Sequence, residues 1–287
     1  MAVVLAVPAA PLPARDAVSA PDPSLLSLNG ATVRKQWQLA QIIDGCARHG
    51  IRGIAPWRDQ LAAMGVKDAV RSIKSNGLTV SGLCRGGFFT AKDWMDDNRR
   101  AIEEAHALGA QCLVLVVGGL IPGSKDLPGS RERVKQGIAA ILPEARKAGV
   151  PLAIEPLHPM QAAERACVNT LEQALDICDA LGEGIGVAVD VYHLWWDPKL
   201  EQQIRRAGNQ RILAYHICDW LVPTRDLLAD RGMMGDGVID LPRIRGWVEG
   251  AGYTGFHEVE IFSELNWWQR DPDEVLQICK SRFATIT

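Results

Sequence analysis

The sequence of 287 residues lacks the features that mark membrane, secreted and nucleic-acid-binding proteins. No apolar run reaches about 18 residues, so we expect no membrane-spanning helix and no membrane partner. The seven cysteines are odd in number and scattered, without a CxxC pair, which favours a reducing, cytoplasmic location over a disulfide framework. The net charge of −3 and the lack of a long basic run argue against a nucleic-acid partner.

The N-terminal segment also lacks what a cleaved signal peptide needs. Residues 1–24 are rich in Ala and Pro, and AVSA resembles a cleavage site. However, no Lys or Arg precedes the apolar stretch, and Pro8, Pro11 and Pro13 interrupt it. We therefore predict a flexible or surface-wrapping N-terminal arm over residues 1–24.

Apolar runs and amphipathic stretches alternate eight times along the rest of the chain. This alternation indicates βαβ units and a parallel sheet. Eight units in a chain of this length favour one (β/α)8 TIM barrel domain over residues 25–287, with an open doubly wound sheet as the alternative. No GxGxxG motif and no GxxxxGK motif follows the first run, so a nucleotide cradle has no support. The predicted strands are 25–30, 50–57, 78–84, 111–119, 151–158, 186–193, 211–219 and 255–262. The predicted helices lie near 34–49, 66–76, 92–108, 130–148, 170–181, 198–207, 240–251 and 272–284.

Three carboxylates and one histidine occur near the carboxyl ends of four of these runs: Glu155, Asp190, His216 and Glu260. The carboxyl ends of the strands meet at one mouth of a closed parallel barrel. Because oxygen donors dominate this set, it suits a hard divalent cation. We predict one divalent metal ion, with Mn2+ as first choice and Co2+, Mg2+ or Zn2+ as alternatives. Glu258 shares a strand face with Glu260, so it is either a partner deeper in the barrel or the ligand itself.

Other residues near the same mouth are candidates for substrate contact. His158 follows Glu155 by three residues, and His193 follows Asp190 by three. Nine tryptophans are available for the apolar walls of a small-molecule pocket or for a subunit interface, which leaves a homo-oligomer, dimer or tetramer, possible. The full set of candidate substrate-binding residues is His158, His193, Trp57, Arg85, Asp219, Trp220 and Arg225.

Five motifs resemble the xylose isomerase-like TIM barrels, which include sugar isomerases and epimerases, inosose dehydratases and the endonuclease IV group. The motifs are IEP, DVYH, YHICD, GDGVIDLP and GYTGFHEVE, and the resemblance covers residues 25–285. In ketose 3-epimerases of this family, ligands that match Glu155, Asp190, His216 and Glu260 bind Mn2+, Co2+ or Mg2+. The resemblance implies that the two glutamates also move the substrate proton and that His193 contacts the substrate.

The resemblance implies a metal-dependent isomerase or epimerase that acts on a keto-sugar or related polyol through a cis-enediolate. A lyase or dehydratase on a keto-sugar, inosose or oxidised glycoside is the alternative, because the same enediolate can expel a leaving group. A non-enzymatic sugar-binding barrel is a third. The endonuclease branch needs three zinc ions and additional histidines. At two positions where that branch has histidine, this chain has glycine: the end of LVLVVGG, and Gly232 after Asp230 and Arg231. The resemblance therefore implies one metal ion and argues against DNA cleavage.

Overall fold

The structure, a computed structural model, describes residues 20–287. The predicted N-terminal arm therefore lies mostly outside the described residues, and its last part forms the 3-10 turn η1 (Pro23–Leu25). Within the described residues, none of the helices combines the length and the apolar character needed to cross a bilayer. All seven cysteines are buried and free, as expected for a chain without a disulfide framework.

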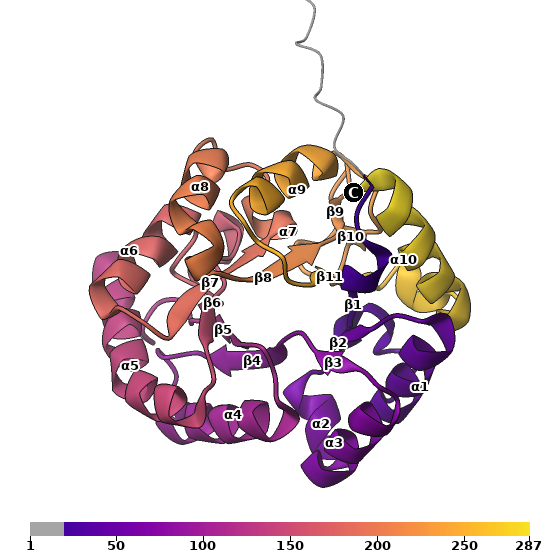
Figure 1. The fold of residues 1–287 in the computed structure, drawn as a ribbon. Helices are drawn as coiled ribbons and strands as arrows, with labels where there is room; N and C mark the ends of the chain where they lie inside the picture. Colours follow the sequence, from indigo (N-terminus) through magenta and orange to yellow (C-terminus); the bar gives the residue numbers. More distant parts are fainter. Residues whose placement is uncertain (1–19) are drawn as a thin grey trace, which may run out of the picture.

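A parallel β-barrel surrounded by helices forms the body of the molecule (Figure 1). The strand order is β3-β2-β1-β11-β8-β7-β6-β5-β4, and every pairing in this sheet is parallel. The predicted TIM barrel is thus confirmed. The strands are β1 (Leu26–Asn29), β2 (Gly53–Ala55), β3 (Thr79–Val80), β4 (Leu83–Gly87), β5 (Leu113–Val116), β6 (Leu152–Ile154), β7 (Ile185–Asp190), β8 (Ile212–Ile217) and β11 (His257–Val259).

The helices form a ring outside the strands (Figure 1). Several end where the sequence predicts, because a glycine follows the last turn: Gly50, Gly109 and Gly149 adopt the left-handed conformation that L-residues avoid. The short helices α2 and α7 were not predicted. The helices are α1 (Leu39–His49), α2 (Arg58–Met64), α3 (Val66–Ser75), α4 (Trp94–Leu108), α5 (Leu127–Ala148), α6 (Leu171–Leu181), α7 (Val191–Leu194), α8 (Leu200–Arg211), α9 (Leu241–Gly250) and α10 (Pro272–Ile286).

All eight predicted strands differ from the observed ones at their ends, and for two of them a side chain explains the difference. The run 78–84 is divided into β3 and β4, because the Ser81 side chain turns inward and bonds Ser27 and Glu258. The predicted strand 186–193 ends at Asp190, whose carboxylate accepts a hydrogen bond from the backbone N–H of Tyr192 at 2.7 Å and caps α7. The final three residues of that prediction are therefore helical.

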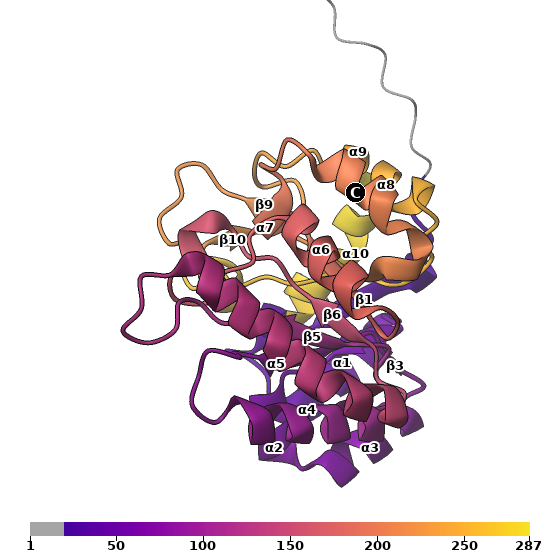
Figure 2. The same cartoon turned by 90° about the vertical axis from the view of Figure 1, so that its left-hand side faces the viewer.

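A two-stranded antiparallel ribbon in the long connection after β8 was not predicted from the sequence. It consists of β9 (Asp219–Trp220) and β10 (Arg231–Gly232). The ribbon lies beside α7, on the left of the molecule in Figure 2, and the rings of Tyr192 and Trp220 join the two at 4.7 Å. It thereby brings a loop residue, Arg231, to the mouth of the barrel.

Small side chains fill the inside of the barrel, as the alternation along the strands predicts. Ala153, Ala188 and Ala214 are buried in one interior cluster, while Val187 and Val189 belong to the large core under the helices. Because the interior is packed, the cavity for chemistry is restricted to the mouth.

We predict that Asn98→Ala destabilises the fold by about 3 kcal/mol, since it leaves buried backbone groups without partners. The Asn98 side chain accepts from the N–H of Gly87 and donates to its carbonyl, each at 2.7 Å, and also donates to the Trp94 carbonyl. Urea unfolding followed by circular dichroism measures the loss. The control is Asn209→Ala on the exposed end of α8, which should unfold like the wild type. Equal stability of the two variants would contradict this account.

Candidate active site

Four ionisable side chains converge at the carboxyl ends of four barrel strands. Glu155 follows β6, Asp190 ends β7, His216 lies in β8 and Glu260 follows β11. One nitrogen or oxygen atom from each of them lies within 4.8 Å of the corresponding atoms of the other three. The least buried of the four is Glu155, at 6% exposed. This is the set that the sequence predicts, and its three carboxylates and one imidazole have the donor chemistry of a divalent cation site.

Glu258 lies deeper than this cluster and is held by its own partners. Strand register places it opposite His216, whose Nε2 is 3.5 Å from a Glu258 oxygen. Asn29 and Ser81 each donate a hydrogen bond of 2.7 Å to its carboxylate. The opposite ring nitrogen, His216 Nδ1, lies 3.0 Å from Glu155 and faces the cluster. Glu258 therefore lies behind the ring, on the side away from the cluster, where a carboxylate partner to a metal-bound histidine is commonly found.

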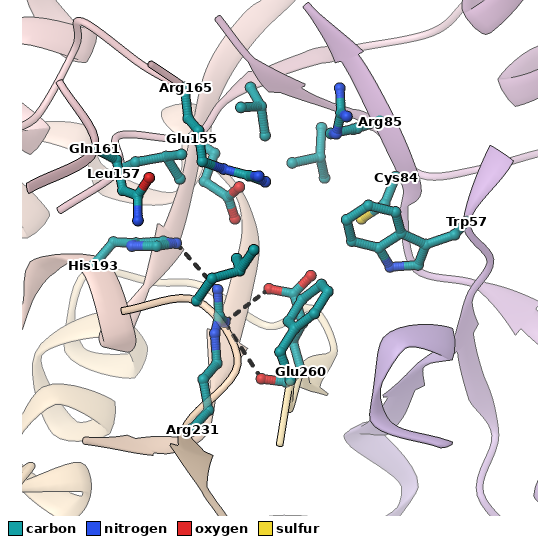
Figure 3. A pocket seen from close by; sticks show the side chains of 14 residues that line it. Trp57, Cys84, Arg85, Glu155, Leu157, Gln161, Arg165, His193, Arg231 and Glu260 are labelled. Atoms are coloured by element: carbon teal, nitrogen blue, oxygen red, sulfur yellow. Dashed lines mark hydrogen bonds and ion pairs between the residues drawn. The ribbon is translucent and has the colours of Figure 1, made fainter. Parts of the chain in front are cut away.

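Arg231 is the main site residue that the sequence did not predict. Its Nη1 lies 3.1 Å from Asp190. The same nitrogen lies 3.1 Å from Glu260, and Nη2 lies 3.1 Å from His193 (Figure 3). The guanidinium packs over the ring of Tyr192 and is buried. It comes from β10, in a connection without hydrophobic periodicity. The pairing of β10 with β9 brings it to the site, and the local sequence does not predict that pairing.

The pKa values of the cluster residues are shifted because several carboxylates are buried close together. Burial raises the pKa of Glu260 to about 8, and Glu155 adds to the rise while Arg231 opposes it. Burial also disfavours ionised Asp190, but the charges of Arg231 and His216 and the hydrogen bond from the Tyr192 N–H outweigh it, and the pKa of Asp190 is lowered. Burial of His216 is likewise outweighed by the carboxylates around it, which raise its pKa well above the usual value. The pKa values of Asp190 and Glu260 are thus shifted in opposite directions, and Asp190 is the more firmly ionised of the two.

His193 is held in the neutral state. Burial lowers its pKa to about 3, despite the nearby Asp190. The backbone N–H of His158 points at Nδ1 at 3.2 Å, and Arg231 points at Nε2. A neutral imidazole accepts at one nitrogen only, so these two donors compete. The His158 ring packs on Trp220 at 5.0 Å, and the residue acts here through its backbone.

A cavity of about 430 Å3, open solvent included, lies over the cluster. Of the predicted substrate residues, Trp57, Arg85 and His193 line it, and Trp57 also donates to Asn29 at 2.6 Å. The sequence did not predict two polar residues on its wall, Gln161 and Arg165, which follow β6 in an irregular loop.

Three predicted substrate residues lie elsewhere. The Asp219 carboxylate accepts four backbone N–H groups, those of Trp220, Gly235, Gly237 and Ile239, so it organises the loop around the ribbon. Trp220 packs behind His158 and Tyr192. Arg225 pairs with Asp230 in the same loop. Polar or aromatic residues just after a strand suggested substrate contact, but the ribbon draws these three into its own hydrogen bonds and packing.

Residues 43–279 match the family model of the xylose isomerase-like TIM barrel. The chain is 26% identical to an inosose isomerase of Bacillus velezensis, over 91% of this chain and 96% of that protein. A protein of Sinorhizobium meliloti with a crystal structure is 61% identical, with a TM-score of 0.90, over 92% and 99% of the two chains. The IolI protein, crystallised with a bound zinc atom, is 23% identical, with a TM-score of 0.73, over 89% and 95%. The chain therefore belongs to the xylose isomerase-like TIM barrel family.

Proposed function

We propose that this chain is a divalent-metal-dependent isomerase or epimerase that acts on a keto-sugar or a cyclic keto-polyol. The observation that carries the proposal is the convergence of Glu155, Asp190, His216 and Glu260 within 4.8 Å, beside an open cavity that Glu155 and Glu260 line. The similarity to an inosose isomerase favours a polyhydroxylated ketone as the substrate class.

The four residues fit a single divalent cation. Arg231 pairs with Asp190 and Glu260, so the three buried carboxylates retain an excess of negative charge that a cation offsets. Glu258 lies 3.5 Å from the outer ring nitrogen of His216, where a metal-bound histidine commonly has a carboxylate partner. Mn2+ stays first choice because carboxylates dominate, and the zinc bound by IolI makes Zn2+ the main alternative. When bound, such an ion supplies Lewis-acid polarisation of a carbonyl and its neighbouring hydroxyl.

Proton transfer is then the task of the chain's own carboxylates. Glu155 and Glu260 approach the cavity from β6 and β11, on two sides of the cluster, and both line it. A base on one side and an acid on the other let a proton leave one face of the substrate carbon and return to the opposite face or to the next carbon. Arg231, beside Glu260, is placed to donate to the oxygen on which charge develops.

The function is tested with a panel of keto-sugars and inososes incubated in deuterated water and followed by NMR. We expect at least one substrate to incorporate solvent deuterium at the carbon beside the carbonyl, because the enediolate exchanges its proton. An isomer or epimer as product supports the proposal, whereas loss of water or of an aglycone assigns the site to elimination. Binding without exchange across the panel would reduce the chain to a sugar-binding barrel.

The metal is predicted to bind in a ratio of one ion per chain. Elemental analysis of the wild type should give one equivalent, and His216→Ala should lose most of it because the only nitrogen donor is removed. The matched control is His106→Ala, on the exposed last turn of α4, which should keep the full equivalent. Three equivalents in the wild type, or full occupancy in His216→Ala, would refute this site.

Glu155→Gln and Glu260→Gln should each lower kcat by about 100-fold to 10,000-fold, through the lost acid or base and weaker metal binding together. His193→Ala should cost about 10-fold to 100-fold and leave the metal bound, because its side chain does not belong to the four-residue cluster. Steady-state kinetics on metal-loaded proteins measure both effects, with Glu264→Gln on the exposed loop after β11 as control. Near-normal turnover of both glutamine variants would move the base to a histidine.

A further inference from the structure

Two arginines in the cavity wall have no acidic partner. Arg85 lies in β4 and Arg165 in the loop after β6, and both line the cavity with Glu155 and Glu260. Within residues 20–287, no carboxylate forms an ion pair with either guanidinium. The Arg85 guanidinium carbon lies 4.1 Å from the centroid of the Phe88 ring, over its face. The Nε of Arg85 is buried without a hydrogen bond.

Two other partly or fully buried arginines nearby, Arg58 and Arg231, do have carboxylate partners. Arg58, which is about as enclosed, pairs with Asp97 and Glu104. Arg231 pairs with Asp190 and Glu260. By contrast, burial lowers the pKa of Arg85, and Arg165 lowers it further. The pKa of Arg165 is lowered by burial and then by Arg231, and Glu155 and Glu260 offset only part of this shift. Two mutually repelling, partly desolvated cations are costly unless an anion joins them.

The charge balance of the metal cluster does not provide that anion. Glu155, Asp190 and Glu260 carry three negative charges when ionised, and a divalent ion together with Arg231 offsets all three. Glu258 is turned away, accepts hydrogen bonds from Asn29 and Ser81, and lies 3.5 Å from His216. Arg85 and Arg165 are then left as a surplus of positive charge on the upper side of the cavity in Figure 3, while Arg231 enters from below.

We infer that the substrate carries an anionic group, a carboxylate or a phosphate, which Arg85 and Arg165 bind while its carbonyl end lies at the metal cluster. The inference rests on the proposed function and narrows its substrate class to acidic sugars and cyclitols. Guanidinium groups from two walls suit a planar carboxylate or a phosphate, because each offers several donors in a fixed plane. Trp57 and Phe262, also in the wall, pack edge to face at 5.5 Å and offer an apolar surface to the carbon chain between the two ends.

Three ligands with one carbon skeleton test this inference: D-fructose, D-fructuronate and D-fructose 6-phosphate. They differ only at carbon 6, which is neutral, a carboxylate or a phosphate, and lies away from the ketone. Calorimetric titration of each into the full-length protein gives the ratio of its Kd to that of D-fructose. We expect at least one anion to bind the wild type at least tenfold more tightly than D-fructose, and the stronger of the two identifies the group.

Arg85→Gln and Arg165→Gln should each reduce that preference at least fivefold, measured as the ratio of the Kd of D-fructose to that of the anion. Arg165→Lys should retain part of it, since it keeps the charge but not the planar fork. The control is Arg71→Gln on α3, which removes a charge of the same sign from an exposed side chain outside the cavity and should preserve the full preference. Circular dichroism of each variant excludes unfolding as the cause.

The titrations are repeated after removal of metal with a chelator, which separates this inference from the proposed function. Metal should tighten all three ligands by a similar factor, whereas the arginine variants should change only the ratio. If metal has no effect on any ligand, the metal-dependent function fails, and the ratio still tests the arginines. No gain of either anion over D-fructose, or a gain that survives both Arg→Gln changes, would overturn the inference.

Discussion

The rest of the site depends on one electrostatic constraint: four carboxylates are buried at one mouth of the barrel. Glu155, Asp190, Glu258 and Glu260 are each at most 6% exposed, and like charges so placed repel strongly where little water screens them. One permanently charged cation of the chain, Arg231, lies among them, together with the His216 ring. The divalent cation proposed above would offset most of the charge that remains. The same constraint explains why Glu258 is bonded by Asn29 and Ser81 instead of facing the cavity.

The ribbon after β8 supplies the arginine that pairs with two of these carboxylates. Arg231 lies in β10, remote from the barrel strands in sequence, and its guanidinium must reach Asp190 and Glu260 in a fixed position. Asp219 fixes the loop by accepting four backbone N–H groups, and the Arg225–Asp230 pair holds its other end. Asp219 and Arg225, which were predicted as substrate-binding residues, hold the loop that positions Arg231.

The predictable part of the molecule is the part with local regularity. Eight apolar runs predicted the barrel, and strand alternation placed Glu155, Asp190, His216 and Glu260 on inward faces before any contact was known. Strand ends were overestimated, because a polar residue that leaves the sheet, such as Ser81 or Asp190, ends a run that hydrophobicity alone continues. Arg165 and Arg231 were not predictable, since they lie in irregular connections and reach the cavity only through tertiary pairing.

The geometry also separates the two classes of group that compete for proton transfer. A base needs a free lone pair directed into the cavity. His193 has a donor aimed at each ring nitrogen, and the Nδ1 of His158 already faces the N–H of Met160 at 3.3 Å. Neither histidine therefore presents a free lone pair without first losing a contact that holds it in place. A carboxylate has four lone-pair positions, so Glu155 and Glu260 can each keep their present contacts and still offer an oxygen to the substrate. This difference in acceptor capacity, which does not depend on the pKa of either group, favours carboxylate chemistry at this mouth over a histidine base.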